Sequence, residues 1–394
     1  MKKYIALFIL LIFIAGLSNA QNRSIEFHHG TFKEILASAK KENKMIFIDC
    51  FTTWCGPCKF MSKNIFTNDS VADFYNQNFI NAKIDMEKGE GLDIAKKYQV
   101  RNYPTMLYLN AEGLQLHRVC GSSETHEFIE NGRVALDPAQ RLATRTEKFR
   151  GGKVGAEYAG KYFSLLEGAC LSKKEALSDY FNHVDQQEFS SKGNWEIIEE
   201  YVTDYFSEPF QNFEKEKDVF SKQYGVDVIN EKITKVTTMG LYAAIDNNDM
   251  IGYSSIKEKL LSAKTNETDK IILESEIYKS QKQKDWKNYA SNVLDYMSRY
   301  SPEEANELNN YAWTFYEHVD DAALLSKAAS WAMTACQLEN NYANNDTYAA
   351  VLFKLGKKQE ARAAADKAIA IAQESNQDFE ETEALLVKIN SLPE

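Results

Sequence analysis

The sequence is poor in cysteine, short of positive charge and almost without membrane-length apolar runs. Six cysteines in 394 residues are too few for a small fold stapled by disulfides. A formal net charge of −11 argues against a nucleic-acid partner, which would favour a basic surface. The chain is nevertheless long enough for about two or three domains. Its 21 Tyr and 22 Phe are sufficient to build their cores.

The N-terminal residues 1–20 have the pattern of a cleaved signal peptide. Two lysines precede an apolar run at residues 4–17, and Ser18-Asn19-Ala20 offers small residues for cleavage. The run is short for a spanning helix, which needs roughly 20 apolar residues, although an uncleaved anchor is the alternative. No cysteine follows the run to accept a lipid, and no other stretch could cross a membrane. We therefore predict a mature, periplasmic protein that begins at Gln21.

Cys55 and Cys58 stand two residues apart, between an apolar run at 45–50 and a helical pattern at 60–65. This order predicts a strand, a tight turn and a helix that begins at Cys55. A helix N-terminus carries partial positive charge and unpaired N–H groups, which stabilise a thiolate. Cys55 is therefore the predicted attacking sulfur, with a lowered pKa. Cys58 lies one turn further on, close enough to form a disulfide, and Gly56-Pro57 keeps the turn tight.

Zinc sites use the same cysteine spacing, so the pair alone does not decide its chemistry. A zinc ion would need two more ligands. His28 and His29 are the only histidines nearby in the sequence, and there is no second closely spaced cysteine pair. The sequence therefore favours redox chemistry without a metal or another cofactor.

Several separated features accompany the cysteine pair. Asp49 interrupts the apolar strand before it, Lys83 lies in a later predicted strand, and Tyr103-Pro104-Thr105 precedes another strand at 106–109. Together with the run Trp-Cys-Gly-Pro-Cys-Lys, they resemble the thioredoxin family over about residues 25–136. The resemblance implies an α/β thioredoxin fold.

The family resemblance also implies roles for the surrounding residues. Asp49 and Lys83 would be the buried pair that helps Cys58 lose its proton. A buried carboxylate costs several kcal/mol unless it is paired or protonated, so a purely structural Asp49 is the alternative. Pro104 would be cis and would present the Tyr103 backbone to an extended substrate beside Cys55. The predicted substrate-binding residues are Trp54, Gly56, Pro57, Tyr103 and Pro104.

The stretch 64–69 lengthens the segment between the cysteine motif and the predicted strand 79–85. Thioredoxins are more compact in this segment. In this respect the chain looks more like the C-terminal thioredoxin domain of transmembrane thiol reductases than like thioredoxin itself. That subgroup works outside the cytoplasm, in agreement with the predicted signal peptide.

Asp137-Pro138 is the predicted end of this domain, with the thioredoxin-like part at 21–136. Residues 137–394 show helical patterns and no convincing strand. We predict helices at 140–149, 154–167, 173–183, 195–206, 212–223, 228–245, 270–279, 286–300, 304–318, 323–339, 347–355, 358–374 and 380–389.

The end of the chain contains a tetratricopeptide-like repeat, clearest at 308–372. Ala349, Gly356, Ala361 and Ala368 stand at positions where paired helices approach closely. Such arrays offer a concave surface for another protein. A helical domain that packs on itself is the alternative.

The other four cysteines, Cys50, Cys120, Cys170 and Cys336, are predicted to be buried free thiols. Cys120 precedes Gly121, which we expect to keep the sheet close to the active-site loop. A regulatory disulfide has no support in the sequence.

Two functions are compatible with these patterns. The first is a periplasmic thiol–disulfide oxidoreductase that reduces or isomerises disulfides of exported proteins and is re-reduced by a membrane thiol reductase. Gly-Pro between the cysteines resembles reducing members of the family. The second is a protein-binding scaffold in which the helical region is the functional part and the thioredoxin domain is a docking module.

Overall fold

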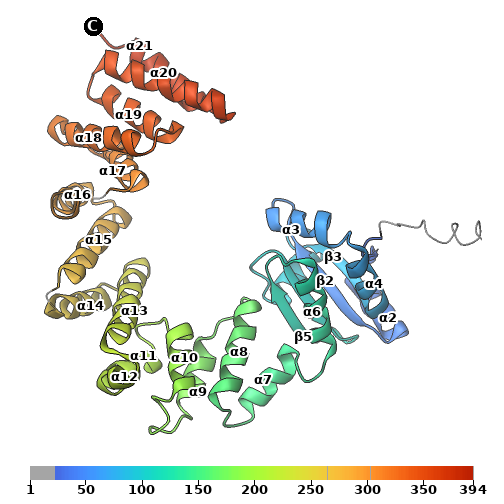
Figure 1. Cartoon of the computed structure of the whole chain (residues 1–394). Helices are drawn as coiled ribbons and strands as arrows, with labels where there is room; N and C mark the ends of the chain where they lie inside the picture. Colours follow the sequence, from blue (N-terminus) through green and yellow to red (C-terminus); the bar gives the residue numbers. More distant parts are fainter. Residues whose placement is uncertain (1–22, 264, 302, 394) are drawn as a thin grey trace, which may run out of the picture. The chain divides into compact units, whose positions relative to one another are not determined.

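The computed structural model describes residues 23–263, 265–301 and 303–393 (Figure 1). The chain divides into two compact units, and the division in the sequence falls between Lys232 and Ile233. The predicted signal peptide at 1–20 lies outside the described residues. Among the helices that are described, none combines the length and the apolar character needed to span a bilayer.

A five-stranded mixed sheet forms the centre of the first unit, in the order β1-β3-β2-β4-β5. Its strands are β1 (Phe27–His28), β2 (Met45–Phe51), β3 (Phe79–Asp85), β4 (Thr105–Leu109) and β5 (Gln115–Cys120). β1, β3 and β2 run parallel, whereas β4 and β5 are antiparallel to their neighbours. β2 is central and buried on both faces, as its apolar run predicted. The predicted α/β thioredoxin fold is thus confirmed.

Alternate side chains of β2 point into two separate cores. Ile46, Ile48 and Cys50 pack with α2 (Phe32–Glu42) and α5 (Gly91–Lys97). Phe47 faces the other core, where the rings of Tyr75 and Phe128 lie 4.8 and 5.6 Å from its own ring. That second core is covered by α3 (Gly56–Phe60), η1 (Met61–Ile65), α4 (Asp69–Asn78) and α6 (Thr125–Leu136). Asp49, two residues from Phe47, belongs to the same face as Phe47.

Side-chain caps fix where α2 and α4 begin. Thr31 and Glu34 form a capping box at the start of α2, as the spacing of a threonine and a glutamate three residues later indicates, and Asn68 accepts backbone N–H bonds at the start of α4. The expected regular helix after Cys55 is only partly correct, because its second turn is the π-helix η1. The N–H of Phe66 bonds to the carbonyl of Met61, five residues earlier. An apolar periodicity does not distinguish this wider turn from an α-helix.

Beyond residue 136 the described part of the chain contains helices and no strand, as predicted. These helices are α7 (Leu142–Arg150), α8 (Ala156–Gly168), α9 (Lys174–Phe181), α10 (Lys192–Tyr201), α11 (Glu208–Lys215), α12 (Lys217–Tyr224), α13 (Val226–Asp246), α14 (Met250–Ala263), α15 (Asn266–Lys282), α16 (Trp286–Tyr300), α17 (Ala305–His318), α18 (Ala322–Leu338), α19 (Tyr342–Lys354), α20 (Lys358–Ser375) and α21 (Glu380–Asn390).

The helices of this region differ from the prediction in several places, of which the following change the order of the elements. α10 ends at Tyr201 rather than 206, because Ser207 caps a new helix with Pro209 in its first turn. The predicted helix 212–223 is two helices, α11 and α12, which separate at Glu216. α14 was not predicted, since its apolar residues mark no clear face.

The second unit has a core rich in alanine. Ala349, Ala361 and Ala368, which the repeat pattern places at close helix approaches, are fully buried. Gly356 adopts a φ of 72° in the turn between α19 and α20, a conformation that favours glycine. The tetratricopeptide assignment itself stays a prediction.

The first helices after the sheet are attached to its β5 edge. The N–H of Leu142 in α7 donates to Nδ1 of His117, at 3.3 Å. A disulfide joins Cys120, at the end of β5, to Cys170, just after α8. The prediction that Cys120 and Cys170 are free thiols is therefore wrong. Two cysteines 50 residues apart are brought within bonding distance by the tertiary fold, and their spacing in the sequence does not reveal it. Cys50 and Cys336 are free. The boundary predicted at 136/137 stays a prediction.

Candidate active site

The cysteine pair lies where β2 gives way to α3. Cys55 is the N-cap of α3, and Cys58 lies in its first turn. The two form a disulfide with their Cα atoms 5.3 Å apart, as predicted. The backbone N–H of Cys58 donates to Sγ of Cys55 at 3.1 Å. After reduction, this donor and the helix terminus favour the thiolate form of Cys55.

Both sulfurs are nearly covered by protein. Cys55 is 3% exposed and Cys58 is 2% exposed. Gly56 and Pro57 separate them at the start of α3, with Pro57 in a position where its missing N–H costs no helical hydrogen bond.

Asp49 and Lys83 are register partners on the neighbouring strands β2 and β3. Nζ of Lys83 lies 3.4 Å from Oδ2 of Asp49. Asp49 is fully buried, and neither of its carboxylate oxygens has a hydrogen-bond partner. Burial raises the pKa of Asp49 to about 6, although the Lys83 charge acts in the opposite direction. The predicted pair is therefore brought together, with a carboxyl group that exchanges protons near neutral pH.

The Lys83 side chain is one-quarter exposed and is surrounded mainly by aromatic rings. Its Nζ lies 4.9 Å from the centre of the Phe51 ring and 5.5 Å from that of Phe66. It also donates a hydrogen bond to the hydroxyl of Ser62 in η1. The lysine is thus held in place by β2, η1 and the residue after η1.

The exposed Trp54 and the partly buried Tyr103 lie beside the cysteine motif. Trp54 is 65% exposed, and its ring centre lies 6.0 Å from that of Tyr103 in an edge-to-face arrangement. The indole Nε1–H of Trp54 donates to the carboxylate of Glu87, at 3.0 and 3.1 Å. An exposed aromatic surface therefore lies directly beside the cysteine motif.

The Tyr103–Pro104 peptide bond is cis, as the family resemblance implied. The Pro104 carbonyl accepts a 2.8 Å hydrogen bond from the N–H of Gly121. Gly121 has a φ of 94°, and a Cβ there would meet nothing within 4 Å. Its glycine is therefore required by backbone conformation rather than by close packing against the active-site loop.

Sequence reasoning missed two residues of this site. Ser62 stands four residues after Cys58, one helical turn further on, so its spacing could have placed it near the motif. Glu87 lies two residues beyond the end of β3, and no spacing in the sequence links it to Trp54.

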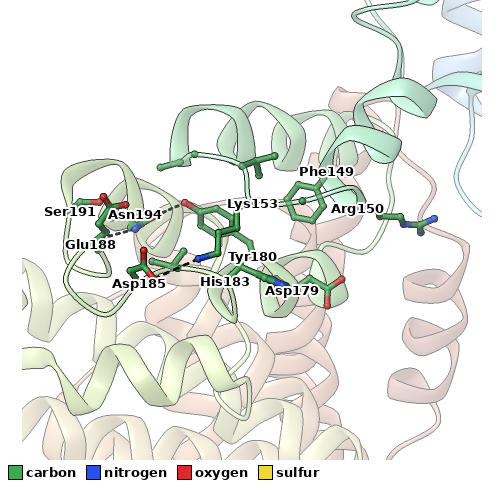
Figure 2. A pocket seen from close by; sticks show the side chains of 15 residues that line it. Phe149, Arg150, Lys153, Asp179, Tyr180, His183, Asp185, Glu188, Ser191 and Asn194 are labelled. Atoms are coloured by element: carbon green, nitrogen blue, oxygen red, sulfur yellow. Dashed lines mark hydrogen bonds and ion pairs between the residues drawn. The ribbon is translucent and has the colours of Figure 1, made fainter.

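A separate hollow of about 420 Å³ lies among α7, α8, α9 and α10 (Figure 2). Tyr180 donates to Asn194 at 2.6 Å, Asn194 donates to the carbonyl of Glu188 at 2.7 Å, and Lys153 pairs with Asp185 at 3.7 Å. These lining groups satisfy one another, and no residue of the cysteine motif contributes to the hollow. Within the described residues, no group of three or more His, Cys, Asp or Glu side chains is arranged to hold a metal ion.

A disulfide between closely spaced cysteines at a helix start, with a buried ionisable carboxyl group on the preceding strand, is typical of the class of thiol–disulfide oxidoreductases. Comparison with known proteins identifies the family. The sequence profile of the thioredoxin family matches residues 23–132.

Individual relatives agree with this match. Thioredoxin-1 of Drosophila melanogaster is 34% identical over 83 residues, which are 21% of this chain and 72% of that protein. The thiol:disulfide interchange protein DsbD of Pseudomonas fluorescens is 22% identical over 98 residues, 24% of this chain and 17% of that protein. The solution structure of a candidate disulphide-isomerase from Bacteroides thetaiotaomicron has 44% identity, covers 30% of this chain and 98% of its own, and has a TM-score of 0.28.

The chain therefore belongs to the thioredoxin family, and its N-terminal part is a thiol–disulfide oxidoreductase with a Cys55–Cys58 redox centre. The matches cover the sheet and its surrounding helices, and none of those described here extends over α7–α21.

Proposed function

We propose that the protein is a periplasmic oxidoreductase that reduces or isomerises disulfides in exported proteins. The observation that carries this proposal is the Cys55–Cys58 disulfide at the start of α3, beside the exposed Trp54 and the partly buried Tyr103. An extended substrate segment would lie across Trp54, Gly56, Pro57 and the Tyr103-Pro104 backbone.

The reaction begins from the dithiol form. The Cys55 thiolate attacks one sulfur of the substrate disulfide, forming a mixed disulfide and releasing the other substrate sulfur as a thiolate that takes up a proton. Cys58 then passes its proton to Asp49, with Lys83 balancing the carboxylate charge, and attacks Sγ of Cys55. The enzyme disulfide forms, and the second substrate sulfur leaves as a thiolate that takes up the proton held by Asp49. Two electrons have then moved from the enzyme to the substrate.

The proposed location rests on two features. The predicted signal peptide would export the chain, and the Cys120–Cys170 disulfide suits an oxidising compartment. Because each reduction leaves the enzyme oxidised, a membrane thiol reductase would have to supply the next electron pair.

Trapping of mixed disulfides tests this proposal. In a Cys58→Ser variant expressed with its signal peptide, the mixed disulfide at Cys55 cannot be resolved. We expect exported proteins to stay covalently attached until a reductant is added. Cys55→Ser is the matched control and should trap nothing. If both variants trap the same proteins, or neither traps any, the proposed function is wrong.

The direction of electron flow has its own test. Titration of the Cys55–Cys58 couple in glutathione buffers should place its potential near that of thioredoxin, about −270 mV. A value near the strongly oxidising end, about −120 mV, would instead assign an oxidase.

The alternative is a binding scaffold, favoured by the long helical region and its self-contained hollow at α7–α10. A double variant, Cys55→Ser with Cys58→Ser, separates the two functions. Full function of this variant in the cell would favour the scaffold, whereas loss of function favours the oxidoreductase.

A further inference from the structure

Ser62 links the cysteine motif to the buried ion pair. Its hydroxyl donates to the carbonyl oxygen of Cys58 at 2.9 Å and accepts a hydrogen bond from the Lys83 ammonium. A hydroxyl has a single proton, which is committed to the Cys58 carbonyl, so the bond from Lys83 must use an oxygen lone pair. The direction of both hydrogen bonds is therefore fixed.

This arrangement leaves Asp49 without a direct hydrogen bond. Charged N–H groups usually approach carboxylates to about 2.7–2.9 Å. The separation between Nζ of Lys83 and Oδ2 of Asp49 is 3.4 Å, and both carboxylate oxygens are buried without a partner. The nearest ammonium thus donates to a neutral hydroxyl while an unsatisfied carboxylate lies within ion-pair distance.

We propose that Ser62 is a positioning residue that diverts the Lys83 ammonium from Asp49 and so preserves Asp49 as a base for Cys58. This inference deepens the proposed function and rests on it. A direct Lys83–Asp49 hydrogen bond would stabilise the carboxylate and weaken its hold on a proton. A weaker base removes the proton of the resolving thiol more slowly.

The charged and titratable groups around Asp49 support this reading. Lys83 on β3 acts on it directly. Cys58 in α3 is the thiol that the proposed reaction deprotonates. Cys50, its neighbour in β2, has a pKa raised by burial and by Asp49, and is influenced in turn by Arg118 of β5. Because Cys50 stays protonated, Lys83 is the counter-charge that sets the basicity of Asp49.

Removal of the Ser62 hydroxyl should bring Lys83 closer to Asp49. The rings of Phe27, Phe51 and Phe66 surround the ammonium but offer no carboxylate or hydroxyl acceptor. If the distance between Nζ of Lys83 and Oδ2 of Asp49 decreases from 3.4 Å to about 2.8 Å, the stronger attraction should lower the pKa of Asp49 by roughly one unit, at an effective dielectric constant near 20.

NMR titration of carboxyl-labelled aspartate in the oxidised full chain tests this directly. Ser62→Ala should lower the Asp49 midpoint, and Ser62→Thr should restore it. Thr67→Ala is the matched control, because the Thr67 hydroxyl also donates to a carbonyl four residues earlier, that of Lys63 at 2.7 Å. An Asp49 midpoint that stays constant or rises in Ser62→Ala, or that falls equally in Thr67→Ala, overturns the proposal.

A kinetic measurement connects the shift to the reaction. At pH 7, Ser62→Ala should resolve a preformed mixed disulfide at Cys55 about threefold more slowly, whereas alkylation of Cys55 should keep its pH profile. A changed Cys55 profile with unchanged resolution would contradict the proposed role. If the wild-type protein reduces no disulfide, the proposed function fails, but the titration of the oxidised protein still decides what Ser62 does.

Discussion

At the scale of single residues, Asp49 is a fully buried carboxyl group at the centre of the sheet. It has no hydrogen-bond partner, and its single counter-charge lies 3.4 Å away. Burial of this kind favours the protonated carboxyl group. The folded protein therefore holds a proton on Asp49 over a range of pH in which the unfolded chain has already lost it.

This difference makes stability depend on pH. Asp49 titrates near 6 in the folded state and near 3.8 when exposed, so the folded state binds more protons between these values. The free energy of unfolding therefore decreases as pH rises through this window. Asp49→Asn should abolish the decrease and stabilise the oxidised protein at pH 7.5 by roughly 3 kcal/mol, with little effect at pH 3.5.

Urea unfolding of the oxidised protein at the two pH values measures this effect. Asp93→Asn, which changes an exposed carboxylate on α5, is the control and should leave the pH dependence unaltered. Equal stability of wild type and Asp49→Asn at pH 7.5 would contradict the buried, ionisable state of this residue.

At the scale of elements, the Cys120–Cys170 disulfide fixes the end of α8 to β5. It closes a loop with a sequence separation of 50 residues. Cross-linking a loop of this length removes conformational entropy from the unfolded chain, worth at most about 4 kcal/mol in the loop-closure model. The double variant Cys120→Ser with Cys170→Ser should therefore lose about 2–4 kcal/mol of stability.

The unfolding midpoint in urea is the readout for this variant. Cys336→Ser serves as control, because Cys336 is a free thiol. A double variant as stable as the control would show that the disulfide does not hold the two elements together.

At the scale of the whole molecule, the thioredoxin fold and the first helices behave as one compact unit that ends near Lys232. α7 covers β5, and Leu142 donates to His117, whose pKa is lowered to about 4 by burial. A fragment of residues 21–136 would expose this edge of the sheet and the His117 ring.

We expect fragment 21–136 to unfold at a lower urea concentration than fragment 21–225, which ends where α12 is complete. In the shorter fragment His117 should titrate closer to its ordinary value near 6.5, because the burial that disfavours its charged form is removed. NMR titration of His117 in both fragments measures this. An unchanged titration would show that the fold is complete at residue 136.

The sequence alone determined the cysteine motif, the central strand and the caps. These are local: Cys55 and Cys58 are three positions apart, the run Met45–Phe51 is apolar throughout, and Thr31 and Glu34 cap their own helix. Asp49, Lys83 and Tyr103-Pro104 follow one another along the chain as they do in the thioredoxin family. That resemblance predicted the rest of the site.

Only the tertiary structure decided the contacts between segments that are distant in the chain. The Cys120–Cys170 disulfide, the bond from Trp54 to Glu87 and the diversion of Lys83 to Ser62 depend on how β2, β3, β5 and their helices come together. Periodicity reports which face of an element is buried, but it does not say which residue of another element will meet it. For that reason the thiol–disulfide chemistry of Cys55 and Cys58 was predictable from the sequence. The roles of Glu87 and Ser62, which contact Trp54 and Lys83, were not.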